Sequence, residues 1–215
     1  MNTVLLMSLI AGLGNTIVLS LLTFLFGGLA GALIALARIS SVPAIRRAAS
    51  VYIQIVQGIP LLVLMGLCFF GPNIIGMRGV APLTAATLAM SIYTSAYMGE
   101  IWRGCLQSVA RAQWEAAECL GLGRAQRMWH VIAPQAVRIA IPPTVGFMVQ
   151  IIKNTSIASL IVGFPELTYN AKIINNATFE PFLYFGLAGA LYFAVCFPVS
   201  ELSRAMERKL NVSRR

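Results

Sequence analysis

Charged residues are scarce in this sequence, and the stretches that lack them are long. Only 11% of the 215 residues are charged and 58% are hydrophobic, whereas a soluble domain carries about 25% charged residues. Residues 1–37 contain no charged residue, and neither do residues 48–77. An apolar run of roughly 18 residues or more with few charges is typical of a membrane-spanning helix. The sequence is therefore that of an integral membrane protein.

Residues that build catalytic and metal sites are also few. The four cysteines, Cys68, Cys105, Cys119 and Cys196, show no metal-site spacing, so we expect them to be reduced and to serve as small apolar residues. No Gly-x-x-x-x-Gly-Lys-Ser/Thr loop is present to hold ATP phosphates. The single histidine, His130, is more typical of packing or of an interface than of catalysis. The sequence predicts no metal, no resident cofactor and no catalytic residue.

The net charge of +9 could suggest nucleic-acid binding, but the placement of the basic residues argues against it. Nucleic-acid surfaces cluster Lys and Arg with interleaved aromatic residues. Here the basic residues lie in short pieces between apolar runs, which is the pattern that orients a multispanning membrane protein. The N-terminus also lacks the basic start of a cleaved signal peptide, so its apolar run is expected to remain as a span.

The apolar pattern predicts an all-α membrane protein with about five transmembrane helices in a single transmembrane domain, residues 1–215. The predicted spans cover residues 13–36, 50–70, 82–100, 139–162 and 181–200. Glycine and proline recur inside them; membrane helices tolerate both, and small residues allow close helix contact.

The basic residues then orient these spans. Three arginines lie in the first connection, five in the third and five basic residues in the tail, against Arg78 and Lys172 on the other side. By the positive-inside rule, the third connection and the tail are cytoplasmic and the N-terminus is outside. An odd number of spans agrees with this orientation.

Within the third connection, residues 110–134 form a polar segment that predicts a short cytoplasmic helix. No Asp, Asn, Ser or Thr caps its start near Ala110, while Gly121 and Gly123 suit the left-handed position that ends a helix. Between them, Glu115, Ala116 and Ala117 present one acid and two small side chains, which would let the helix sit deeply in a partner's groove. The alternative is a solvated loop helix with no partner.

The spacing Glu-Ala-Ala, three residues, Gly, nine residues, a β-branched residue, two residues, Pro is matched by Glu115-Ala116-Ala117, Gly121, Val131 and Pro134. It resembles the signature of permease subunits of bacterial ATP-binding-cassette (ABC) importers. The resemblance implies that the segment is a coupling helix that docks into a cytoplasmic ATPase dimer, where ATP is bound. It also implies a multi-pass inner-membrane protein, an extracytoplasmic solute-binding protein and a second permease copy or related permease as partners.

Further blocks resemble the polar amino acid permeases within that family. They are QGIPLL (residues 57–62), SAYMGEIWRG (95–104), VIAPQAVR (131–138) and KNTSIASLI (153–161) followed by Glu-Leu. Three positions depart from the usual pattern: Gln57 replaces Arg, Ala112 replaces Gly and Asn154 replaces Asp. The first and last lie where substrate selectivity might be set.

Lys153 is the candidate substrate contact, because a charge inside a span costs about 2.5–3.5 kcal/mol and usually faces a cavity or the bundle interior. Its ammonium would meet the carboxylate of an amino acid, with Asn154, Thr155, Ser156, Gln57 and Tyr97 as further substrate-binding candidates. The structural alternative is an ion pair with Glu100 or Glu166, or extension of the side chain to the outer interface. Glu100 is expected to pair with Arg103, three residues later on one helix.

The leading interpretation is the membrane subunit of an importer for a polar amino acid, with glutamate, aspartate or a neutral polar amino acid favoured because Asn154 offers no negative charge to a basic substrate. One alternative is an ion-coupled secondary transporter, although such folds usually contain internal repeats and none is visible. A permease of the same family for another small polar solute is a second alternative, and an assembly factor without a pore is a third.

Overall fold

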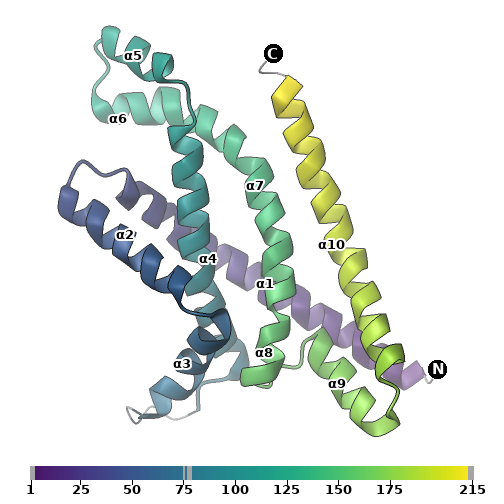
Figure 1. Ribbon diagram of the computed structural model, residues 1–215. Coiled ribbons are helices and arrows are strands. Elements are labelled where there is room, and N and C mark those ends of the chain that lie inside the picture. Colours follow the sequence, from purple (N-terminus) through teal and green to yellow (C-terminus); the bar gives the residue numbers. More distant parts are fainter. Residues whose placement is uncertain (1–2, 75, 77–78, 213–215) are drawn as a thin grey trace.

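The computed structural model describes residues 3–74, 76 and 79–212, and every regular element in those ranges is a helix (Figure 1). The elements are α1 (Thr3–Arg38), α2 (Pro43–Gly58), α3 (Leu61–Ile74), α4 (Pro82–Gln107), α5 (Arg111–Cys119), α6 (Arg124–Gln126), the π-helix η1 (Arg127–Ile132), α7 (Ala133–Asn154), α8 (Ser156–Ile161), α9 (Leu167–Thr178) and α10 (Pro181–Val212). The predicted all-α class is confirmed.

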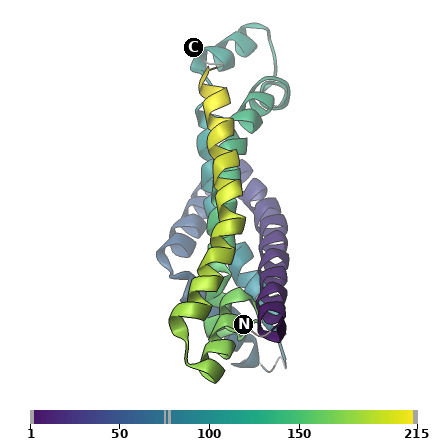
Figure 2. The same cartoon turned by 90° about the vertical axis from the view of Figure 1, so that its right-hand side faces the viewer.

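The long helices run between two ends of an elongated molecule. Helices α5 and α6 lie at the same end as the C-terminus, and the N-terminus lies at the opposite end with α8 and α9 (Figures 1 and 2). The polar segment and the basic tail therefore share one end, as the predicted topology requires. Arg78, which the prediction puts on the other side, lies outside the described residues.

Helices α1 and α4 form the most extensive contact of the bundle. Their contact rests on glycines: a Cβ added at Gly27 would lie 2.6 Å from the Cβ of Thr94, and one added at Gly31 would lie 2.8 Å from the Cβ of Met98. A Cβ added at Gly99 of α4 would come equally close to the side chain of Ile34 of α1. Small residues at such spacing let two helix backbones approach closely without a large apolar side chain between them.

In the part of the chain that the structure describes, three helical stretches are long and apolar enough to cross a membrane: Thr3–Arg38, Arg124–Ile161 and Pro181–Leu210. The predicted second span, residues 50–70, is not one straight helix. It divides into Pro43–Gly58 and Leu61–Pro72, which meet at 99° and together could form a fourth span. Pro60 explains the break, because a proline disfavours helical geometry in the residue before it and removes a backbone donor.

The predicted third span, residues 82–100, forms α4 but is too polar to belong to that set. Its polar side chains face other helices: Ser91, Thr94 and Ser95 are buried, and the Ser95 hydroxyl lies 2.6 Å from that of Tyr52 on α2. Helix α4 is thus a central helix with buried polar groups, of which Ser95 is bonded within the bundle while the Ser91 hydroxyl has no hydrogen-bond partner.

The predicted fourth span, residues 139–162, is longer than expected at its start and interrupted near its end. Helix continues back through η1 to Arg124, and a turn at Thr155 separates α7 from α8. The Thr155 hydroxyl donates to the Ile152 carbonyl at 2.8 Å, and the Ser156 hydroxyl to the Lys153 carbonyl at 2.7 Å. These side-chain bonds to backbone compete with regular helix bonds and accompany the break.

Candidate functional site

Helix α5 carries the Glu-Ala-Ala triplet and ends as the sequence predicts. Its N-cap is Ala110, without a side-chain cap. At its end Gly121 has φ +72°, its N–H donates to the Glu118 carbonyl at 2.9 Å, and the Leu122 N–H donates to the Ala117 carbonyl at 3.2 Å. This pair of bonds is the Schellman arrangement, which needs a left-handed residue.

Gly123 does not share that geometry, so its predicted left-handed conformation is wrong. Its φ is −62°, and its N–H donates to the Gln126 side chain at 2.9 Å. It begins the next helical stretch instead of ending α5. Between them, Gly121 and Gly123 turn the chain from α5 into η1 within a few residues.

One face of α5 is packed and the other is open. Ala117 is buried, and the neighbouring Trp114 packs on a small apolar cluster that includes Val109, Ile132 and Ala136. Glu115 is exposed and paired with Arg111, 2.9 Å away on the same helix. The helix is therefore held to η1 and α7 while the Glu115 side stays free to meet a partner.

The π-helix η1 lies between α6 and α7. Pro134 follows directly in α7; it has no N–H to donate, and its ring opposes the carbonyl four residues earlier, which is where the backbone adopts the wider turn. Isolated π turns often lie at functional sites. His130 is exposed in η1, with Nδ1 3.1 Å from the Gln126 carbonyl oxygen.

A charge cluster lies where α1 and α4 end near α5. Arg103 donates through Nε to Glu100 at 2.9 Å, which confirms the predicted (i, i+3) pair. Arg38 from α1 approaches the second oxygen of Glu100 at 3.7 Å, outside hydrogen-bond distance. One carboxylate thus faces two guanidinium groups, and the cluster keeps a positive balance.

Lys153 lies in the last turn of α7, at the end of the molecule opposite α5 (Figure 1). It is exposed, and among residues 3–74, 76 and 79–212 no carboxylate lies within 4.0 Å of its ammonium. Neither of the two ion pairs in the structural alternative is formed; extension of the side chain to the outer interface stays a prediction. Glu100 binds Arg103, as described above.

Glu166, the other expected partner, is engaged elsewhere. It is fully buried and caps α9, accepting from the Thr168 N–H at 2.9 Å and the Tyr169 N–H at 2.8 Å. The Tyr192 hydroxyl of α10 donates to it at 2.6 Å. Glutamate is not among the preferred N-cap residues, so the sequence signalled neither this cap nor the bond from the tyrosine 26 residues later.

The polar side chains beside Lys153 gather toward α4. Asn154 accepts from the Gln150 amide at 3.1 Å and lies next to Tyr93. Tyr97 contacts Tyr93 with ring centroids 4.5 Å apart and stacks on Phe147 at 5.7 Å. Sequence reasoning missed Phe147 and Gln150, although both share a helix face with Asn154 at i−7 and i−4.

The remaining predicted substrate contacts are distributed differently. Gln57 is exposed at the end of α2, beside the bend. Thr155 is buried and Ser156 is half-buried, and both hydroxyls bond to the chain's own backbone. The structure brings Asn154 and Tyr97 to one aromatic-lined region through Tyr93, and Lys153 directly precedes Asn154 in α7.

Comparison with known proteins adds a family to this geometry. Residues 25–212 match the family described as binding-protein-dependent transport system inner membrane component. The probable amino-acid ABC transporter permease protein YckA of Bacillus subtilis (strain 168) is 36% identical over 200 residues, 93% of this chain and 88% of that protein. The L-cystine transport system permease protein TcyB of the same organism is 34% identical over 201 residues, covering 93% and 85%.

A solved structure shows the same arrangement. The crystal structure of an amino acid ABC transporter with histidines superposes with a TM-score of 0.88 at 36% identity, covering 94% of each chain. The fold described above therefore matches that of a solved amino acid ABC transporter along nearly its whole length.

Proposed function

We propose that this chain, which belongs to the family of binding-protein-dependent transport system inner membrane components, carries an acidic or neutral polar amino acid across the membrane and meets that substrate at Lys153. As a member of the family, the chain is a multi-pass inner-membrane permease subunit of an ABC importer for amino acids. It is not the catalytic subunit, and the system includes an ATPase and a binding protein. The substrate and its contacts are the proposal.

The observation that carries the proposal is the unpaired ammonium of Lys153. A lysine at this depth costs about 2.5–3.5 kcal/mol unless it faces a polar cavity or an opposite charge. Both carboxylates that could have paired with it are bonded elsewhere. A substrate carboxylate would supply the missing partner, and the Gln150–Asn154 pair would supply neutral donors and acceptors beside it.

Selectivity would follow from residue 154. An aspartate there would attract a cationic side chain by direct Coulomb interaction, and asparagine does not. The aromatic group formed by Tyr93, Tyr97 and Phe147 would line the path on the α4 side. Glutamate, aspartate and neutral polar amino acids are the substrates that this arrangement favours.

The proposal extends to assembly and orientation. The apolar side chains of α10 are largely exposed, among them Phe182, Phe193 and Phe197, so a second copy or a related permease would cover part of this surface. The single domain, residues 1–215, would dock through α5, with Glu115, Ala116, Ala117, Gly121 and Pro134 of the 110–134 segment at the ATPase groove. The N-terminus would be outside and the tail cytoplasmic.

Uptake assays on the reconstituted transporter test the substrate contact. Lys153→Met should abolish uptake while the complex stays assembled. The matched control is Lys172→Met, at an exposed position of α9, and it should transport normally. Lys153→Arg should rescue only partly, because a forked guanidinium does not replace a compact ammonium. Asn154→Asp should shift preference from acidic toward cationic substrates.

Double variants separate the two roles of Lys153. If Lys153→Met regains uptake when Glu100 or Glu166 is also neutralised, Lys153 serves the bundle and not the substrate. Mass spectrometry of the amino acid that co-purifies with the complex identifies the substrate directly, and a strongly basic one would contradict the selectivity argument.

A further inference from the structure

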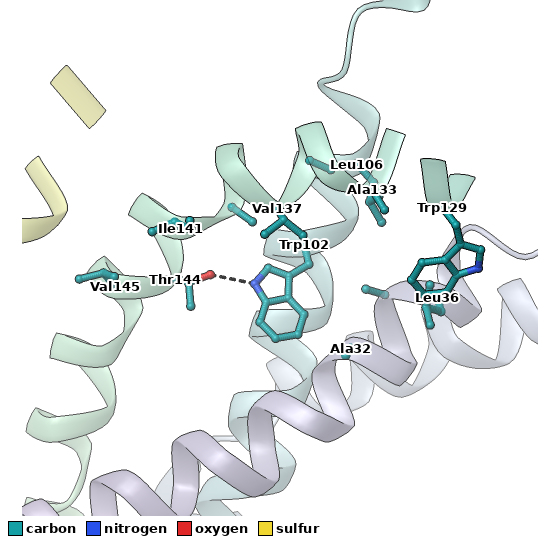
Figure 3. Close-up of a pocket in the computed structure, with 13 residues that line it drawn as sticks. Ala32, Leu36, Trp102, Leu106, Trp129, Ala133, Val137, Ile141, Thr144 and Val145 are labelled. Carbon is teal, nitrogen blue, oxygen red and sulfur yellow. Dashed lines mark hydrogen bonds between the residues drawn. The ribbon is translucent and has the colours of Figure 1, made fainter. Parts of the chain in front are cut away.

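An apolar groove opens on the molecule away from Lys153, between the last turns of α1, the end of α4 and the first half of α7. Its volume is about 430 Å³. Small side chains form its floor (Ala32, Ala35, Ala133, Ala136 and Ala140), and Trp102 and Trp129 border it (Figure 3). The Trp102 indole N–H donates to Thr144 at 2.8 Å, so its polar group is satisfied and its ring faces the groove. The groove therefore offers an occupant almost only apolar contacts.

A basic pocket of about 280 Å³ continues from one end of this groove. Leu106 lines both, and Arg38, Arg46, Gln107 and Trp114 line the pocket. The Nε of Arg38 is buried without a hydrogen-bond partner, and Arg46 uses one Nη to donate to the Ser40 carbonyl at 3.2 Å. The Nε of Arg38 lies beside Glu100, so the remaining Nη groups of Arg38 and Arg46 are the donors that the pocket offers to an anion.

The charge balance around the pocket is positive. Glu100 is the carboxylate that approaches Arg38, and it is already bonded to Arg103. Gln107 accepts a hydrogen bond from Arg103, which leaves its amide N–H group to donate. Guanidinium groups pair best with carboxylate or phosphate. The donors of this pocket are therefore suited to a ligand with negatively charged oxygen atoms.

The dimensions fit one leaflet of a bilayer. The groove follows α7 from Ala133 to Val145, a rise of roughly 18 Å at 1.5 Å per residue. Half of the hydrocarbon core of a membrane is about 15 Å thick. Tryptophan at the basic end is typical of a membrane–water interface.

We propose that the groove and the basic pocket together bind one anionic phospholipid of the inner leaflet. The phosphate lies against Arg38 and Arg46, and an acyl chain lies along the alanine floor between Trp102 and Trp129. Basic pockets between membrane helices on the cytoplasmic side are suited to anionic headgroups. The lipid would thus connect α1, α4 and α7 close to the segment that leads into α5.

A helix of a second permease copy fits these features less well. It would cover the apolar floor but would also bury two arginines, and burying a charge without a partner is costly. A second copy has only seven acidic residues against sixteen basic ones to offer. A phospholipid supplies the apolar chain and the anion in one molecule.

Tryptophan fluorescence of the full-length chain tests the proposal directly, because all three tryptophans line the groove or the pocket. The chain is reconstituted in phosphatidylcholine bilayers that contain increasing fractions of either brominated phosphatidylglycerol or brominated phosphatidylcholine. Brominated phosphatidylglycerol should quench at a several-fold lower mole fraction. Added glycerol phosphate should not reverse the quenching, since the acyl chain is part of the ligand.

Two variants locate the site. Arg46→Gln should lower the preference for phosphatidylglycerol about threefold more than Arg47→Gln, which removes the same charge from the same helix outside the pocket. The control measures the general attraction of any basic residue to an anionic surface. Ala140→Phe should fill the groove and reduce quenching by either brominated lipid.

Three results would overturn the proposal. The first is equal quenching by the two lipids, which would mean simple exposure to the bilayer. The second is an equal effect of Arg46→Gln and Arg47→Gln. The third is an efficient cross-link from a cysteine at position 137 to a second copy of the chain, which would mean that protein occupies the groove.

Discussion

The contact between α1 and α4 makes a quantitative prediction at Gly27. A methyl group added there would lie 2.6 Å from the Cβ and 2.7 Å from the Cγ2 of Thr94, whereas carbon atoms in favourable contact are about 3.5–4.0 Å apart. The Cβ of Thr94 is fixed by its backbone and cannot rotate away. The two helices must therefore separate by about 1 Å if Gly27 becomes alanine.

The expected cost follows from two opposing effects. Overpacking in a dense core costs about 1–3 kcal/mol, and alanine in place of glycine gains up to about 1 kcal/mol of helix propensity. We expect Gly27→Ala to lower the free energy of unfolding by about 1–2 kcal/mol. For a chain of this length that corresponds to a fall in the melting temperature of about 2–8 °C.

The same helix provides the control. An added methyl at Gly14 would meet nothing within 4 Å, so Gly14→Ala should match the wild type or melt slightly higher. The assay is the fraction of monodisperse protein that remains after heating, measured for all variants at one heating rate. Gly27→Ala combined with Thr94→Gly should recover stability relative to Thr94→Gly alone. If Gly27→Ala behaves like Gly14→Ala, the two helices do not meet as described.

Three further predictions concern other parts of the chain. Glu115→Lys or Gly121→Asp should abolish uptake without preventing membrane insertion. Glu115→Lys reverses a charge on the proposed docking helix, and Gly121→Asp puts a strained left-handed residue at its end. Near-normal substrate-stimulated ATP hydrolysis in either variant would contradict the docking role. On a background without native cysteines, a membrane-impermeant thiol reagent added outside should label position 78 and spare position 208; efficient labelling at 208 would reverse the orientation. Glu166→Gln should destabilise the protein by about 1–3 kcal/mol, because an amide NH₂ cannot accept from the donors that the carboxylate binds; an unchanged melting temperature would refute the capping role.

Local features of the sequence predicted the local structure correctly where that structure requires one particular residue type. Gly121 was expected to end a helix, and it has φ +72°. Glu100 and Arg103 were expected to pair across one helical turn, and they do. Gly123 shows the limit of that reasoning: two glycines near one helix end are equally suitable, and only the first adopts the left-handed conformation.

Composition predicted the membrane class but not the shape of the spans. Hydropathy counts apolar residues along the chain and contains no information on the direction of the helix axis. Residues 50–70 therefore appeared as one span, although Pro60 marked a possible break. The structure bends there by 99°. Whether a proline in an apolar run is accommodated or turns the chain depends on neighbouring helices that can bond the released carbonyls, and no single segment contains that information.

The ion pairs around Lys153 also depend on tertiary contacts that the sequence does not show. From the sequence, Glu100 was expected to pair with Arg103, and an ion pair of Lys153 with Glu100 or Glu166 was the structural alternative. In the structure Arg103 of the same helix binds Glu100 and Arg38 of α1 approaches it, while Tyr192 of α10 donates to Glu166. Both acids are therefore engaged without Lys153, although Oε2 of Glu100 accepts no hydrogen bond, and within the described residues no carboxylate is paired with Lys153. If Lys153 meets the substrate as proposed, this arrangement favours release of the cargo, because an internal carboxylate at Lys153 would compete with the substrate for the ammonium.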